Sequence, residues 1–177
     1  GLHTLLDIVL DLRGKQGLQT ADVVQIDCGL HPQKVAYLDR PAPTENLAAK
    51  FSVQYCVAVA LLNGKVGLAD FNDIIIFEAQ RREWMKKIQI TPREDFGSFE
   101  CEIVVRKKDG STLSGRMLEA RGSIRNPLSE AELLAKFEDC ASGMLATAQA
   151  KAAGTALLAI DKTTDLAQTI GALCPRG

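Results

Sequence analysis

The chain has 177 residues, a formal net charge of -1 at pH 7 and a hydrophobic content of 46%. That hydrophobic content is enough to fill a core, which excludes a disordered chain. The near-zero net charge does not favour nucleic acid or an anionic membrane surface as a partner. The longest apolar run, residues 57–62, is far shorter than the roughly 18 residues of a membrane span. We therefore expect a globular protein with no nucleic-acid partner and no membrane partner.

The first residues have the pattern of a helix. Leucine and valine recur at helical spacing at positions 5, 6, 9 and 10, which predicts a helix over residues 3–12. No capping residue, initiator methionine or signal-peptide pattern precedes it. We therefore expect the chain to be part of a longer protein.

The cysteines indicate reduced thiols. They stand at positions 28, 56, 101, 140 and 174, widely spaced and without a CxxC pair. Such spacing is typical of buried thiols in an intracellular protein, and we expect a cytoplasmic location, or a mitochondrial one in a eukaryote. Cys28 and His31 have the spacing of half a metal site, but His3 is the other histidine and nothing completes the set. We expect no metal site.

Two short strands follow the first helix. Alternating β-branched residues predict a strand over residues 21–28. Residues 34–38 predict a second one, with Tyr37 near its end. The segment RPAP, residues 40–43, stops this strand because proline cannot donate a hydrogen bond to a ladder.

A long helix is expected next. Thr44 is a capping residue with Glu45 in the first turn, so the helix is predicted to run from there to about Leu62. It ends at Asn63-Gly64, a favoured left-handed stop. The helix is apolar on every side, yet its first half contains hydrogen-bonding side chains at Lys50, Ser52, Gln54 and Tyr55.

The middle of the chain alternates short elements. Residues 68–72 predict a short helix or turn, and residues 73–78 the end of a loop or a strand. Residues 79–87 predict a charged helix, and residues 88–91 a strand that ends before a proline.

The clearest local signal is a hairpin. Two alternating runs within residues 99–119 flank Asp109-Gly110, a strong turn sequence. After a linker at residues 122–127, the sequence SEAE at residues 129–132 is a capping box that predicts a helix. An alanine-rich stretch then predicts more helix and no strand.

These elements together predict an α+β fold in two parts. Residues 1–122 form an α+β domain with a small antiparallel sheet, and residues 123–177 form a helical segment. That segment is too short to be a domain alone. Its apolar faces must pack on the first part, on a missing part of the protein or on a second copy of the chain.

Four residues are candidates for chemistry, each with a plainer interpretation. Tyr37 suits proton donation or a hydrogen bond to a substrate, and His3 suits proton transfer, but both residues also suit structural roles. Arg40 and Lys50 suit carboxylate binding or plain surface solvation.

The other polar residues indicate structure. Ser52 and Tyr55 lie in a helix too apolar to be solvated, so we expect them to satisfy each other or nearby backbone. The basic residues within 81–87 predict a solvated surface, and Asp70 and Asp73 do not indicate an acid/base pair. The sequence contains no phosphate-binding glycine loop, nucleophile elbow or HExxH motif.

Four segments resemble the C-terminal part of the MmgE/PrpD family: GLHTLLDIVLDLRG, VAYLDRPAPTENLAAKFSVQYCVAVALLNGKVG, KKDGSTLSGRM and RGSIRNPLSEAELLAKFEDCAS. The most specific blocks are RPxPxxxxxAKFSxQY at residues 40–55 and NPLSxxELxxKF at residues 126–137. The resemblance covers roughly residues 1–141 and fades beyond about Met144. The family includes 2-methylcitrate dehydratase, cis-aconitate decarboxylase and iminodisuccinate epimerase.

The resemblance implies a two-domain enzyme. A large helical domain is built from the N-terminal half and the last helices, and a smaller α+β lid is inserted before those helices. On that pattern residues 1–122 are the lid and residues 123–177 are the returning helices. A missing N-terminal helical domain is then the main partner, and we also expect a homodimer.

The resemblance also implies a function. We expect a lyase or isomerase of small di- or tricarboxylates, 2-methylcitrate dehydratase-like, that moves protons in the cleft between the domains without a metal or organic cofactor. The choice among dehydration, decarboxylation and epimerisation stays open, because the discriminating residues would lie upstream. Most catalytic residues would lie on the missing domain, so we expect the isolated chain to be inactive. The alternative is a non-catalytic binding or dimerisation module with the same fold.

The resemblance assigns roles to particular residues. Tyr37 corresponds to the family's lid tyrosine and is expected to face the substrate, with His3 near the cleft as a second catalytic residue. Arg40 and Lys50 are expected to bind the substrate. Ser52 and Tyr55 are expected to form the scaffold of the site.

Overall fold

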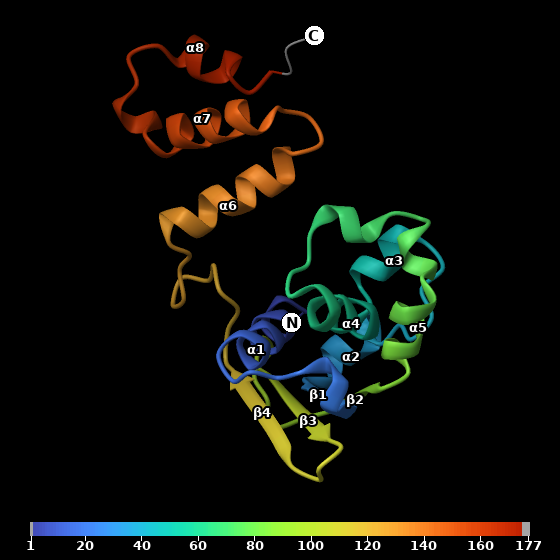
Figure 1. Cartoon of the computed structure of the whole chain (residues 1–177). Helices are drawn as coiled ribbons and strands as arrows, with labels where there is room; N and C mark the ends of the chain where they lie inside the picture. The colour runs from blue at the N-terminus through green and yellow to red at the C-terminus, as the bar shows by residue number, and fades with distance from the viewer. Residues whose placement is uncertain (1, 175–177) are drawn as a thin grey trace. The chain divides into compact units, whose positions relative to one another are not determined.

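The computed structural model describes residues 2–174 (Figure 1). The chain divides into two compact units, Gly1–Asn126 and Pro127–Gly177. None of the helices in residues 2–174 has the length and apolar character of a membrane span.

The first unit is built on a four-stranded sheet with the order β2-β1-β3-β4. β1 (Val23–Leu30) pairs in parallel with β2 (Ile88–Pro92) and antiparallel with β3 (Cys101–Lys107). β4 (Thr112–Met117) pairs antiparallel with β3. The α+β prediction is confirmed, but the sheet is mixed rather than antiparallel. The reason is that β1 and β2 are joined by a long helical crossover, and a crossover of that kind produces parallel pairing.

The predicted hairpin is present at β3 and β4. Gly110 has a φ of 81°, which a glycine adopts without strain. Asp109 closes the turn, since its carboxylate accepts from the backbone N–H of Ser111 at 2.9 Å and from its hydroxyl at 2.6 Å.

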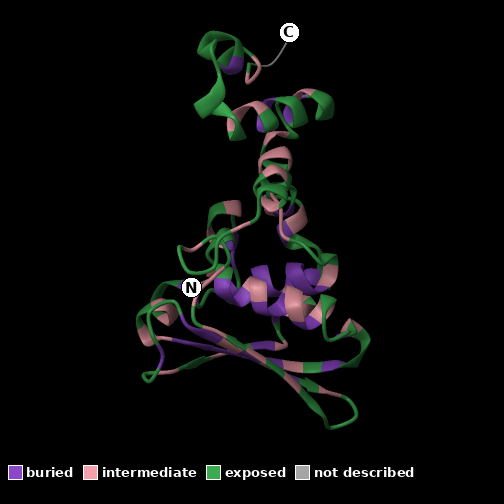
Figure 2. Cartoon of the chain, turned by 90° about the vertical axis from the view of Figure 1, so that its left-hand side faces the viewer, coloured by how far each residue is buried: buried purple, intermediate pink, exposed green. Residues whose placement is uncertain are grey.

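Two helices pack on the sheet. α1 (Leu2–Gly14) contacts β3, β4 and α4 (Val53–Asn63), and α4 also contacts β2 and α5 (Ala79–Met85). A Cβ added to Gly115 of β4 would lie 2.6 Å from Ile8 Cγ2, so this glycine lets α1 approach closely. Buried residues gather between these helices and the sheet (Figure 2). α4 is covered on all sides, which explains its apolar sequence.

The segment before the RPAP elbow is a helix, so the predicted strand at residues 34–38 is wrong. α2 (Pro32–Leu38) begins with a proline at its first position, where the missing N–H costs nothing. His31 caps it, because its Nδ1 accepts from the backbone N–H of Gln33 at 3.3 Å. Tyr37 therefore projects from the last turn of a helix.

The predicted long helix after the elbow is divided in two. α3 (Asn46–Lys50) ends before Phe51, and its N-cap position is Glu45 rather than Thr44, without a capping hydrogen bond from the side chain. α4 starts afresh because the Ser52 hydroxyl accepts from the backbone N–H of Tyr55 at 3.0 Å. The chain thus turns sharply at Phe51.

Short 3-10 turns complete the first unit. η1 (Thr20–Asp22) precedes β1, and η2 (Leu68–Phe71) and η3 (Ile75–Phe77) lie between α4 and α5. For residues 73–78 the end of a loop or a strand was predicted. The structure has the 3-10 turn η3 there and no strand.

The second unit is helical within its described residues, as predicted. It consists of α6 (Glu130–Ala141), α7 (Thr147–Leu158), η4 (Ile160–Lys162) and α8 (Leu166–Gly171). The predicted capping box is present: Ser129 Oγ accepts from the Glu132 N–H at 3.3 Å, and Glu132 Oε2 accepts from the Ser129 N–H at 2.9 Å.

Candidate functional site at the α1–α2–α3 junction

Three predicted site residues meet at one cavity. The cavity has a volume of about 360 Å³ and lies where α1, α2 and the end of α3 converge. It is lined by Leu2, His3, Tyr37, Leu38, Lys50 and Phe51. The fold therefore brings together His3, Tyr37 and Lys50 from three separate helices.

The Tyr37 side chain is accessible to a ligand. Its side chain is 42% exposed, and its hydroxyl has no hydrogen-bond partner among residues 2–174. The ammonium of Lys34, one turn earlier on α2, lies 5.6 Å from the centre of the Tyr37 ring. A phenol in this position can donate a hydrogen bond or a proton to a bound molecule.

Lys50 is a lining residue of the same cavity. It is exposed at the last position of α3, and its ammonium lies 5.9 Å from the centre of the Phe71 ring. No carboxylate in residues 2–174 forms an ion pair with it. An aromatic face holds an ammonium without neutralising it, so Lys50 keeps its charge for an anionic ligand.

Arg40 makes its hydrogen bonds with the end of α2 and with Ser52. Its Nε donates to the backbone oxygen of Tyr37 at 2.9 Å, which closes the end of α2. Its own backbone oxygen accepts from the Ser52 hydroxyl at 2.6 Å. Arg40 does not line the cavity, so its role in binding stays a prediction.

Ser52 and Tyr55 lie fully inside the first unit. The Ser52 hydroxyl joins the elbow to α4, since it donates to Arg40 and accepts from the N–H of Tyr55. The Tyr55 hydroxyl donates to the backbone oxygen of Asp70 and accepts from Arg81 Nη1 at 3.1 Å. Both side chains are bound to backbone or interior groups, as a scaffold requires.

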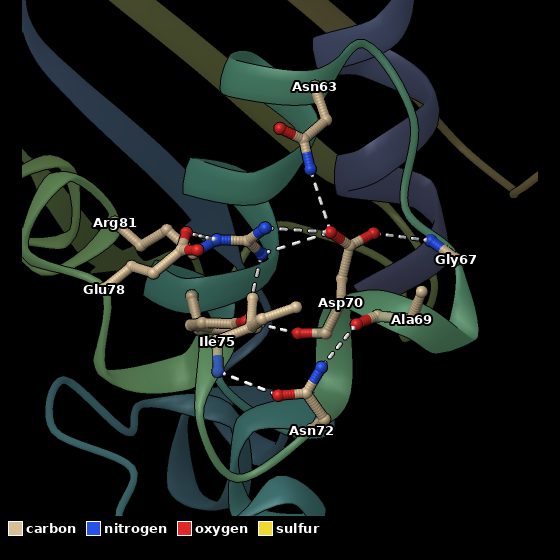
Figure 3. Close-up of polar contacts among 9 residues, drawn as sticks. Asn63, Gly67, Ala69, Asp70, Asn72, Ile75, Glu78 and Arg81 are labelled. Atoms are coloured by element: carbon tan, nitrogen blue, oxygen red, sulfur yellow. Dashed lines mark hydrogen bonds and ion pairs between the residues drawn. The ribbon is translucent and has the colours of Figure 1, made fainter.

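A buried ion pair anchors this interior. Asp70 Oδ1 accepts from both terminal nitrogens of Arg81 at 3.1 Å, and each residue is 8% exposed (Figure 3). Asn63 Nδ2 at 2.8 Å and the backbone N–H of Gly67 at 2.9 Å donate to the same carboxylate. Arg81 Nε donates to Glu78 at 2.9 Å. The network ties η2 to α4 and α5.

The network corrects the expectation that residues 81–87 are all solvated surface. Arg81 is buried because Asp70, from a different element, meets its guanidinium with both charges paired. One signal was present in the sequence. Tyr55 stands in an apolar helix and needs a buried partner for its hydroxyl, and Arg81 supplies it.

Burial makes the interior groups unreactive. Desolvation raises the pKa of the Tyr55 phenol above its usual value, although the nearby Arg81 charge lowers it in part. Burial likewise raises the pKa of Cys56 to about 12 and that of Cys101 to about 11. These thiols stay protonated at neutral pH and are not nucleophiles.

A second cavity adjoins the first. It has a volume of about 760 Å³ and shares His3 with the smaller one. Its other lining residues are Thr4, Phe99 and residues 119–125, which include Arg121 and Arg125. His3 thus stands between two hollows of the first unit.

Cys28 and His31, which have the spacing of two metal ligands in the sequence, have other surroundings in the structure. Cys28 is buried in β1, and His31 uses its side chain to cap α2. Within residues 2–174, no group of three His, Cys, Asp or Glu side chains is arranged to hold a metal ion.

Comparison with known proteins places the chain in a family. Residues 1–162 match the family described as MmgE/PrpD C-terminal domain, so the chain belongs to the MmgE/PrpD family. The resemblance in the sequence motifs is thereby confirmed.

Two curated relatives are cis-aconitate decarboxylases. The chain is 36% identical over 115 residues to the protein of Homo sapiens and 35% identical over 115 residues to that of Mus musculus. Each match covers 63% of this chain and 24% of the relative. The chain therefore matches about a quarter of the length of these relatives.

Proposed function

We propose that this chain is the lid domain and the returning C-terminal helices of an MmgE/PrpD-type lyase or isomerase that acts on small di- or tricarboxylates. The observation that carries the proposal is the convergence of His3, Tyr37 and Lys50 on one cavity. Family membership and the cis-aconitate decarboxylases among the relatives support lyase chemistry on a carboxylate substrate.

Each of the three residues has a role in this proposal. Lys50 binds a substrate carboxylate, because its ammonium is exposed and unpaired. The Tyr37 hydroxyl donates a hydrogen bond or a proton as charge develops on the substrate. His3 lines both cavities and suits proton transfer, since an imidazole ring has one nitrogen that can donate a proton and one that can accept it.

The same three residues serve more than one reaction of the family. The sequence-based expectation favoured dehydration of a 2-methylcitrate-like substrate and left decarboxylation open, and the relatives support decarboxylation of cis-aconitate as the rival reaction. Both need a carboxylate held by a cation and a proton moved at a neighbouring carbon. In this proposal the remaining catalytic groups come from an N-terminal helical domain, the assembly is a homodimer, and the 177-residue chain alone is inactive.

A substrate panel tests the function. The full-length natural protein is assayed with cis-aconitate, 2-methylcitrate and iminodisuccinate, and in parallel with the 177-residue chain. We expect turnover of at least one substrate by the full-length protein and none by the isolated chain. If a folded full-length protein turns over none of the three substrates, the enzyme proposal is wrong.

The two histidines provide a matched pair for the site. We expect His3→Asn to lower kcat by about 10²- to 10⁴-fold, the range of a lost acid/base group. His31→Asn is the control, because asparagine is a good helix cap and His31 lies outside both cavities. Equal kcat values for His3→Asn and His31→Asn would remove His3 from the mechanism.

A further inference from the structure

Lys34 lies beside one residue of each cavity, although it lines neither of them. It stands on α2, and its ammonium is 5.6 Å from the centre of the Tyr37 ring and 5.1 Å from the centre of the Phe99 ring. Tyr37 lines the smaller cavity and Phe99 lines the larger one, while His3 lines both. Two rings from distant parts of the chain, one from the lining of each cavity, thus lie near the same ammonium.

The charge of Lys34 is positioned but not neutralised. Some other lysines of the first unit pair with acids, such as Lys15 with Asp11 at 2.9 Å and Lys86 with Glu83 at 2.5 Å, whereas Lys50 and Lys87 lie over aromatic rings as Lys34 does. No carboxylate in the part of the chain that the structure describes forms an ion pair with Lys34. Aromatic faces attract an ammonium through their quadrupole and leave its charge and its N–H donors for an anion.

The larger cavity has a positive lining as well. Arg121 and Arg125 belong to it together with a single acid, Glu119, which pairs with Arg125 at 3.3 Å. Both arginines therefore already interact within the protein, and the inference rests on Lys34 and Lys50.

We propose that Lys34 is a second carboxylate-binding residue of the site. Lys50, from α3, holds one carboxylate of the substrate, and Lys34, from α2, holds another, with Phe99 keeping the Lys34 ammonium in place. This inference rests on the proposed function, because it assumes a polycarboxylate ligand beside Tyr37. It makes Lys34 a residue that selects for the number of carboxylates.

The test uses Lys34→Met in the full-length natural protein. KM and kcat are measured for the substrate that the wild type turns over. Inhibition constants are measured for propane-1,2,3-tricarboxylate, glutarate and butyrate, which differ in carboxylate number. We expect Lys34→Met to raise KM and the tricarboxylate inhibition constant about tenfold or more, with butyrate unchanged, since a hydrogen bond to a charged group is lost.

Three further variants define the cause. Lys34→Arg should restore most of the affinity, and Phe99→Leu should weaken the tricarboxylate less than Lys34→Met does, because the ammonium is then present but less well placed. Lys108→Met is the control, since Lys108 is exposed in the turn between β3 and β4. It should keep wild-type constants.

The outcomes separate this inference from the proposed function. If the wild type turns over a polycarboxylate and folded Lys34→Met keeps its KM and its preference for three carboxylates, the role of Lys34 is wrong and the function stands. If no polycarboxylate is turned over and none raises the melting temperature of the wild type, both fail. Should Lys34→Met not fold, Lys34→Gln takes its place in the same measurements.

Discussion

Charged and phenolic side chains are paired in the buried Asp70–Arg81 network and unpaired at the rim of the smaller cavity. In the interior, Arg81 and Asp70 pair with each other and Tyr55 has two hydrogen-bond partners. At the rim, Lys50 rests on an aromatic ring without an acid, and the Tyr37 hydroxyl has no partner among residues 2–174. A fold must satisfy the polar groups that it buries, whereas a binding site must leave some unsatisfied. Pairing, rather than residue type, thus separates scaffold from site.

The largest expected effect is on the interior. Arg81→Met leaves the Asp70 carboxylate and the Tyr55 hydroxyl buried without their cation. Breaking a buried pair from one side costs about 3–5 kcal/mol, so we expect a loss of that order in the free energy of unfolding. Urea denaturation measures it. Lys86→Met, which removes only a surface pair, should cost below about 1 kcal/mol, and a similar loss in both variants would contradict the contrast.

The rim should respond in binding and not in stability. Lys50→Met removes an exposed ammonium, so the melting temperature should stay at the wild-type value. KM for the polycarboxylate substrate should rise about tenfold to a hundredfold, because a charge-assisted hydrogen bond is lost. Steady-state kinetics of the full-length protein give KM. A wild-type KM together with a lowered melting temperature would assign Lys50 to the scaffold.

Glu100 gives the smallest effect and a pH dependence. It is paired, since its carboxylate accepts from the Gly97 N–H at 2.9 Å and from Arg116 Nε at 2.7 Å. These bonds, the Gly97 bond first, lower the pKa of Glu100 below its usual value of 4.5. The charged form therefore stabilises the fold above pH 4.5, and this contribution is lost as the pH falls below that value.

The variant Glu100→Gln checks this sign. It should lower the melting temperature slightly at pH 7 and reduce the further loss seen when the wild type is taken below pH 4.5. Thermal melts at a series of pH values provide the measurement. Parallel curves for the two proteins would show that Glu100 has no such linkage.

Local patterns in the sequence predicted part of the fold. The hairpin at Asp109-Gly110 and the capping box at Ser129 depend on neighbours in sequence, and both are present. α2 was missed although Pro32 after His31 is a helix start, because Tyr37 and its neighbours also suit a strand. The break at Ser52 was missed because a serine in an apolar run gives no sign that it caps a new helix.

Contacts between distant segments were beyond local patterns. Arg81 stands in a basic run, and its burial follows only from the position of Asp70 in η2. Residue type made His3, Tyr37 and Lys50 candidates and the family resemblance strengthened them, but their meeting at one cavity required the fold. Lys34 had no signal, because its partner Phe99 is far away in the sequence.

The two tyrosines provide the most direct test of the central claim. Tyr37 is 42% exposed, and Tyr55 is 0% exposed with two hydrogen-bond partners for its hydroxyl. Tyr37→Phe and Tyr55→Phe remove the same oxygen from the full-length protein, and kcat/KM and the melting temperature are measured for both. We expect Tyr37→Phe to lose about 10²- to 10⁴-fold in kcat/KM at an unchanged melting temperature.

Tyr55→Phe should behave in the opposite way. It should lower the melting temperature, because Arg81 and the Asp70 carbonyl lose a buried partner, and it should keep kcat/KM within a few-fold at temperatures where it is folded. Unchanged turnover in Tyr37→Phe, or a loss of turnover in Tyr55→Phe at the wild-type melting temperature, would contradict the separation of site from scaffold.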